Sequence, residues 1–148
     1  MDLKQRLQDD IKAAMRAGDR DRLQMLRTLH AAIRQREIDE QTEFGDDGVL
    51  QVIEKQIKQR KDSLQQYTEA GRQDLAAREQ SEIEILQQYL PEPLGEAELQ
   101  ELIDTVVAET GAESMADMGR VMGELKSRVQ GRADMKAVSE AVRARLGA

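Results

Sequence analysis

Cysteine is absent from the 148 residues, and aromatic residues make up only 2% of them. Without cysteine the chain has no disulfide bond, no thiolate zinc site and no thiol nucleophile. With so few aromatic side chains, a hydrophobic core has to be built from Leu, Ile, Val, Met and Ala. Together with 34% charged residues, this composition favours amphipathic helices over strands, which are rich in β-branched and aromatic residues.

Metal-ligating side chains are also scarce. His30 is the single histidine, and one imidazole without thiolates does not form the usual shell of a transition metal. It lies in an apolar stripe, so we expect a packed histidine at the edge of a core rather than a general base. The acidic stretch 37–47 fails as a calcium loop counted from Asp39, because Phe44 stands where glycine is needed and Leu50 where glutamate is needed. We therefore expect a solvated inter-helix loop and no metal ion.

Common enzyme motifs are missing as well. The chain has no GxxxxGK[ST], GxGxxG, HExxH or GxSxG pattern, which argues against a phosphate-cradling loop, a zinc-protease helix and a serine-hydrolase elbow. We predict no catalytic residue and no cofactor. The sequence starts with a charged segment instead of a secretory signal, and no apolar run approaches the roughly 20 residues of a membrane span. The expected location is cytoplasmic, without membrane contact.

Apolar residues recur at spacings of three and four along most of the chain, and glycines separate these stretches. Such spacing places each set on one face of a helix, so the sequence predicts an all-α fold. Pro91 and Pro93 end the fourth helix, because neither has a backbone N–H to donate. The clearest stripes contain Leu3, Leu7 and Ile11; Leu23, Leu26, His30 and Ile33; Ile53, Ile57 and Leu64; Ile83, Leu86 and Leu90; Leu99, Ile103 and Val106; Val121, Leu125 and Val129; Val138, Val142 and Leu146.

The two prolines also mark the expected domain boundary. Residues 1–91 predict an N-terminal domain of four helices, the last two of which form a long hairpin. Residues 92–148 predict a small C-terminal domain of three helices. Ser114 and Asp117, three residues apart, have the pattern of a capping box, and Asp134 is placed to cap the last helix.

Arg60 interrupts the apolar stripe of the long hairpin, which spans 49–90. Folding the hairpin at Gly71 sets Arg60 opposite Glu82, since both lie eleven residues from the turn, and Glu79 is one turn away. We predict a partly buried arginine–glutamate pair that fixes the register of the helices more than it stabilises them, because desolvation offsets most of the attraction. An arginine–carboxylate active site is the less favoured alternative, because no nucleophile or base accompanies the pair.

Charge is distributed unevenly. The formal net charge is −7, which disfavours nucleic acid globally because phosphates are repelled by a negative surface. Residues 92–118 contain eight acids and no Lys or Arg, whereas residues 119–148 contain seven bases and three acids. The last thirty residues are therefore the one basic stretch that we consider as an anion-binding surface.

Gly119 and Gly123 lie inside a predicted helix, where each costs roughly 1 kcal/mol relative to alanine. Two explanations compete: close packing against another helix, which we favour, and close approach of a ligand such as nucleic acid. Gly131 lies at the turn before the last helix. A surface floored by the two helical glycines could accept a phosphate backbone, although it lacks aromatic rings for base stacking. The basic residues along its edge are Lys126, Arg128, Arg132 and Lys136.

Two segments resemble the YqeY family. Residues 118–146 are similar to the end of YqeY proteins and to the tail of the B subunit of the glutamyl/aspartyl-tRNA amidotransferase, and residues 55–91 also resemble YqeY. The segments that support the resemblance are Gly119-x-x-Met122-Gly123, Gly131-Arg132-Ala133-Asp134, Val138-x-x-x-Val142, Gln59-Arg60-Lys61-Asp62-Ser63 and Tyr89-Leu90-Pro91.

The resemblance implies a helical N-terminal domain followed by a smaller helical domain. In the amidotransferase the tail is similar to a tRNA-binding appendage, which implies Arg132 and Lys126 as phosphate contacts here, with Gly119 and Gly123 allowing approach. The implied partners are tRNA or an amidotransferase or aminoacyl-tRNA component. The kinase-type part of that subunit and the separate amidase subunit have no counterpart in this sequence.

The sequence and the resemblance leave three candidate functions. The first is a non-catalytic accessory protein that binds tRNA or another RNA through the C-terminal domain. The second is carbon–nitrogen ligase activity with glutamine as amido-N-donor, or a subunit of such an enzyme, which the resemblance implies. The third is a protein-interaction adaptor. The sequence does not define the oligomeric state.

Overall fold

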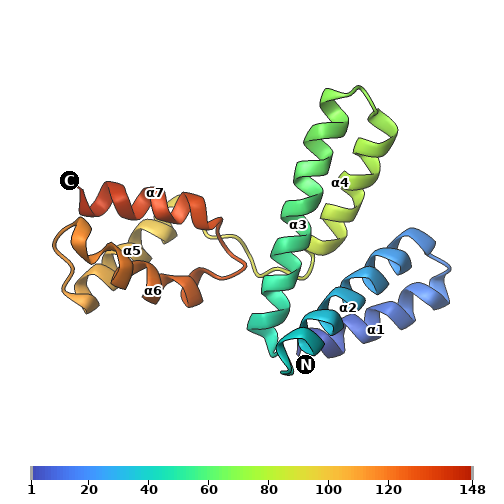
Figure 1. Ribbon diagram of the computed structural model, residues 1–148, viewed down its shortest axis with the longest axis horizontal. Helices are drawn as coiled ribbons and strands as arrows, with labels where there is room; N and C mark the ends of the chain where they lie inside the picture. The colour runs from blue at the N-terminus through green and yellow to red at the C-terminus, as the bar shows by residue number, and fades with distance from the viewer. Residues whose placement is uncertain (1, 148) are drawn as a thin grey trace. The chain divides into compact units, whose positions relative to one another are not determined.

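The computed structural model describes residues 2–147, and these residues form helices and the turns between them (Figure 1). The all-α fold expected from the sequence is confirmed. No described helix combines the length and apolar character needed to cross a bilayer. The α-helices are α1 Leu3–Ala17, α2 Arg20–Glu40, α3 Asp46–Glu69, α4 Gln73–Gln87, α5 Glu96–Thr110, α6 Met118–Val129 and α7 Met135–Leu146, and a 3₁₀ turn, Met115–Asp117, precedes α6.

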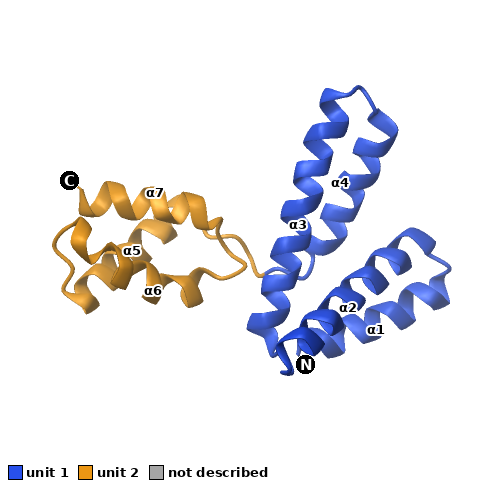
Figure 2. Cartoon of the chain, in the orientation of Figure 1, with its two compact units in different colours: residues 1–90 blue, residues 91–148 orange. Residues whose placement is uncertain are grey.

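The chain forms two compact units, residues 1–90 and 91–148 (Figure 2). Each unit has a hydrophobic cluster of its own, built from aliphatic side chains as the composition requires. The domains predicted from the sequence, 1–91 and 92–148, remain a prediction, since compactness does not show that either part folds alone.

The first unit consists of two helical hairpins, α1–α2 and α3–α4, that share one core (Figure 1). Gly71 makes the turn of the second hairpin at a φ of 72°, a left-handed conformation that costs glycine little. The apolar stripes of the four helices meet inside the unit. The most deeply buried large side chains include Leu7, Leu26, Leu29, Ile53 and Leu86.

Tyr89 ties the end of α4 to α1. Its ring is buried, its hydroxyl donates to a carboxylate oxygen of Asp10, and the guanidinium of Arg6 lies 4.6 Å from the ring centroid. Burial and the bond to Asp10 raise the pKa of the Tyr89 hydroxyl, so it remains a donor at neutral pH. α4 ends at Gln87, one turn before the expected stop at Pro91, and Tyr89 lies in the turn that follows.

The loop predicted over 37–47 is shorter in the structure, so this prediction was wrong in extent. α2 continues to Glu40 and α3 begins at Asp46. Glu37 is the reason that the acidic stretch does not extend freely into solvent. Its side chain is 7% exposed, pairs with the Lys4 ammonium and accepts the Phe44 N–H at 2.8 Å. One carboxylate therefore holds together α1, α2 and the connection to α3.

The second unit packs α5, α6 and α7 around a core of valine, leucine and isoleucine. Ser114 and Asp117 form the predicted capping box, which begins the 3₁₀ turn before α6. Asp134 caps α7 by accepting the Lys136 N–H. The Leu94 N–H donates to the Arg132 carbonyl at 2.8 Å, so the segment that enters α5 is fixed against the turn that leaves α6.

Glu37→Gln is expected to lower the free energy of unfolding by about 1–2 kcal/mol at pH 7, since it removes a charge-assisted hydrogen bond to Lys4. The Lys4 and Phe44 donors lower the pKa of Glu37 below its ordinary value. This stabilisation is therefore present above the ordinary glutamate pKa and is lost as the pH falls through the lowered pKa of the folded state. Urea unfolding at pH 7 and pH 3 measures both effects.

Glu43→Gln in the adjacent loop is the matched control, because Glu43 is exposed. An equal loss of stability in both variants at pH 7, or the same difference between wild type and Glu37→Gln at both pH values, would contradict this role of Glu37.

Candidate nucleic-acid interface

α6 is held to the second unit by one buried face. Val121, Leu125 and Val129 are fully buried, and their spacing of four residues gives one apolar stripe. Gly119, Gly123 and Lys126 follow a spacing of four and three, so they share another face of the same helix. All three are exposed. The face that Gly119, Gly123 and Lys126 were predicted to share is therefore accessible.

The packing explanation for the two helical glycines is wrong. A Cβ atom added to Gly119 or Gly123 would meet nothing within 4 Å apart from the local helix backbone. No other described helix of the second unit comes within 4 Å of these positions, because α6 turns its valine and leucine face to the core instead. The two glycines therefore leave the backbone of α6 uncovered, and close approach of a ligand stays a prediction.

The four basic residues predicted for this surface differ in their availability. Lys126 and Lys136 are exposed, and neither forms an ion pair within the described part of the chain. Arg128 lies 2.8 Å from Glu109 and 3.8 Å from Glu124, and the bond to Glu109 raises the pKa of its guanidinium.

Arg132 is half-buried and serves the fold. Its Nε donates to the Glu92 carbonyl at 2.9 Å, and its Nη2 lies 3.5 Å from Glu98. Gly131, beside it, has a φ of 74°, so the turn between α6 and α7 needs glycine there. The strip predicted from four cations thus offers two unpaired lysines, while both arginines have carboxylate partners. Their role as phosphate contacts stays a prediction.

The hairpin contains the Arg60–Glu82 pair that its register predicts. Arg60 Nε lies 3.1 Å from Glu82 Oε2, with side-chain exposures of 14% and 24%. The other end of the guanidinium donates to the Gln56 carbonyl at 3.2 Å. Glu79 lies near the pair; burial, together with the charge of Glu82, raises the pKa of its carboxyl. Two of the three guanidinium nitrogens thus have partners within the hairpin, which fits a structural role.

His30 is half-buried. It lines a hollow between α1 and α2 together with Lys4, Gln8, Arg34 and Glu37. The described residues contain no group of three His, Asp or Glu side chains placed to hold a metal ion. The histidine lies at the edge of the core, where the apolar stripe of α2 placed it.

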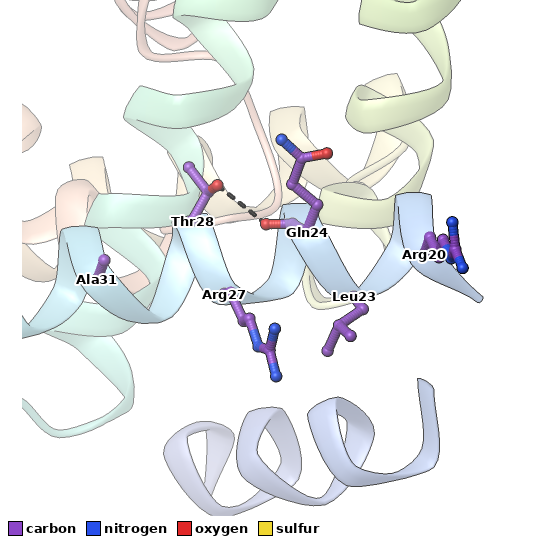
Figure 3. Close-up of a pocket in the computed structure, with 6 residues that line it drawn as sticks. All are labelled: Arg20, Leu23, Gln24, Arg27, Thr28 and Ala31. Atoms are coloured by element: carbon purple, nitrogen blue, oxygen red, sulfur yellow. Dashed lines mark hydrogen bonds between the residues drawn. The ribbon is translucent and has the colours of Figure 1, made fainter. Parts of the chain in front are cut away.

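Sequence reasoning missed a second basic surface, on the outer side of α2. A shallow hollow follows this helix from Arg20 to Ala31 (Figure 3). The signal was present in the sequence: Arg20, Arg27 and Arg34 recur every seven residues.

Comparison with known proteins gives one family and several relatives. The family model described as "Yqey-like protein" matches residues 4–146. A protein of Pyrenophora tritici-repentis named "Altered inheritance of mitochondria protein 41, mitochondrial" is 34% identical over 97% of this chain and 80% of its own length. Proteins with the same name are 39% identical in Lachancea thermotolerans, over 70% of this chain and 57% of the relative, and 30% identical in Saccharomyces cerevisiae, over 80% and 68%.

These names correct one expectation. The relatives are named as mitochondrial proteins, which contradicts the cytoplasmic location expected from the sequence. The expectation rested on the absence of a secretory signal and of a membrane span, and neither observation distinguishes the cytoplasm from an organelle.

Gly123→Ala is expected to stabilise the protein by about 1 kcal/mol, because alanine is the better helix former and its methyl group meets no atom here. The measurement is urea or thermal unfolding. Ala108→Gly, at an exposed position inside α5, is the matched reverse change and is expected to destabilise by a similar amount. A loss of stability in Gly123→Ala would show that the site is not open.

Glu82→Leu is expected to cost about 1–3 kcal/mol, because it leaves the Arg60 guanidinium largely buried without its carboxylate. The double variant Arg60→Leu with Glu82→Leu is expected to recover most of that loss, since two leucines extend the apolar stripe of the hairpin. Urea unfolding of Arg60→Leu, Glu82→Leu and the double variant gives the coupling energy between the two side chains. Additive losses in the double variant would contradict the pairing.

Proposed function

Because the chain belongs to the YqeY family, we propose that it is a non-catalytic accessory protein that binds tRNA through the open face of α6. We define this face by Gly119, Gly123 and Lys126, with Lys136 at the start of α7. The observation that supports the proposal is the pair of exposed helical glycines beside an unpaired lysine. Glycine at such a position lowers the stability of the helix relative to alanine. Close approach of a ligand to the backbone would explain why glycine is found there.

The chemistry of the face suits phosphate rather than bases. A lysine without a carboxylate partner donates to phosphate oxygens, and such contacts position a nucleic acid without reading its sequence. No aromatic residue lies in the second unit, since Phe44, Tyr67 and Tyr89 are the chain's three aromatic residues. The face therefore lacks the rings on which unpaired bases stack. We infer recognition of backbone shape and charge.

Carboxylates limit the strength of this binding. Arg128 and Arg132 are engaged by Glu109 and Glu98, so few phosphates can be neutralised and the affinity should be modest. Binding should fall steeply with salt, because each neutralised phosphate adds a little under one unit to the slope of log K against log salt.

Binding of labelled tRNA to the full chain, measured by fluorescence anisotropy between 50 and 200 mM salt, tests the proposal. Since the curated relatives are named as mitochondrial, mitochondrial tRNA belongs in the assay beside total tRNA. We expect Lys126→Gln with Lys136→Gln to lower the salt slope by roughly 1–2. Gly119→Gln with Gly123→Gln is expected to weaken binding without loss of charge, because the added side chains keep the backbone of α6 away from the phosphates.

Two controls match these changes. Lys55→Gln with Lys58→Gln removes two exposed charges from α3, and Ala108→Gln adds bulk on the exposed side of α5. tRNA binding that is the same in the α6 variants as in these controls would remove the proposed surface. Release of ammonia from glutamine by the purified protein would instead favour amide-transfer chemistry, and a partner protein retained after nuclease treatment would favour an adaptor.

A further inference from the structure

The outer side of α2 presents an unbroken row of exposed residues without an acid. Its six members follow alternating spacings of four and three, and we call them the arginine stripe. They are Arg20, Gln24, Arg27, Ala31, Arg34 and Ile38. Three positive charges therefore recur every seven residues, or about 10.5 Å along the helix axis, in a protein whose net charge is −7.

The arginines of the stripe form no ion pair with a described residue of the first unit, although, besides the hydrogen bond from Lys4, the charge of Arg34 lowers the pKa of Glu37. Arg27 Nη2 contacts the thioether of Met15 at 3.6 Å, and neither Arg20 nor Arg34 forms an ion pair with a described residue. Other arginines of the same helix have polar partners: Arg22 donates to the Gln88 side chain at 2.9 Å and Arg36 pairs with Glu40 at 2.9 Å. The stripe arginines differ from Arg36 because the acids of α2 lie on neighbouring faces of the helix and not within the stripe.

The neighbouring surface of α1 adds to the positive field. Lys12 is exposed, and it lies three residues from Met15, which Arg27 contacts. Glu37 is the acid nearest to Arg34 in the hollow between the helices, but it is buried and already paired with Lys4. The hollow along α2 is shallow, and Arg27 and Leu23 point towards α1 while Thr28 and Gln24 point to the opposite side (Figure 3).

We propose that the arginine stripe binds the phosphate backbone of RNA, as a surface separate from the open face of α6. Arginine is suited to this role because its planar guanidinium binds phosphate oxygens with two hydrogen bonds. Gln24 and Thr28, between the arginines, have side chains of the kind that also contact phosphates. The phosphates of double-stranded DNA recur about every 3.4 Å per strand along the duplex axis. This interval is shorter than the roughly 10.5 Å between successive arginines of the stripe, so a nucleic-acid backbone offers phosphates at a finer spacing than the arginines.

Two other partners fit the stripe less well. The spacing of four and three is that of a helix–helix seam, but such a seam needs apolar residues, and three of the six positions are arginine. A lipid surface needs large apolar side chains that enter the bilayer interface. Ile38 is the one large apolar side chain of the stripe, and it lies at its end.

The test compares the full-length protein with Arg20→Gln, Arg27→Gln and Arg34→Gln combined, using labelled tRNA as the probe. The control combines Lys55→Gln, Lys58→Gln and Lys61→Gln, which removes the same charge from exposed positions on α3 of the same unit. We expect the arginine variant to bind at least roughly tenfold more weakly at 50 mM salt and to lose about 2 from the salt slope, whereas the control changes little. Circular dichroism checks that both variants are folded.

Equal tRNA binding by the arginine and lysine variants would overturn the proposal, as would the absence of tRNA binding by the unaltered protein at 50 mM salt. An arginine variant that binds tRNA normally but no longer sediments with anionic phospholipid vesicles would also overturn it. The two surfaces can fail separately. Loss of binding in the arginine variant with normal binding in Lys126→Gln plus Lys136→Gln would support the stripe and remove the open face of α6.

Discussion

Carboxylates outnumber basic side chains in this chain, 29 to 22, and an arginine or lysine within their reach is neutralised. Pairing therefore decides which cations a ligand can use. Arg36, Arg60, Arg128 and Arg145 are all held by glutamate or aspartate, and in the hairpin or at the core edge such pairs fix the register of the helices. Both proposed surfaces consist of the cations that remain. They are defined as much by where the acids lie as by where the bases lie.

The two proposed surfaces differ in how a phosphate backbone would approach them. On α6 the charge is low, but Gly119 and Gly123 have no side chains, so a backbone can come close to the helix and to Lys126. On α2 the helix keeps its side chains, and three exposed arginines lie along a face without acids. Binding at the open face of α6 should depend mainly on shape, because the contact is close and weakly charged. Binding at the arginine stripe should depend mainly on ionic strength, because the contact is extended and charged. Changes in bulk and changes in charge are therefore expected to act unequally on the two.

Periodicity in the sequence was enough to predict the all-α fold, the hairpin and the Arg60–Glu82 register, because each depends on residues at fixed intervals within one or two neighbouring helices. Capping at Ser114 and Asp134 was equally local. The features that the sequence did not predict depend on contacts between distant segments. The extent of the 37–47 loop depends on Lys4, far away in α1. The contacts of Arg132 with Glu92 and Glu98 form where the turn after α6 meets α5 and the segment before it. The openness of the two glycines followed from which face of α6 the core takes.

A net charge of −7 does not exclude a polyanion, because the relevant quantity is the local potential at the distance of contact. At physiological salt the screening length is about 8 Å, shorter than the spacing of roughly 10.5 Å between successive arginines of the stripe. Acids more than one screening length away therefore contribute little where a phosphate sits, whereas an acid in the same hydrogen-bonded shell cancels the cation directly. Arg128, with Glu109 at 2.8 Å, is the second case, whereas Arg27 contacts a neutral thioether and forms no ion pair with a described residue.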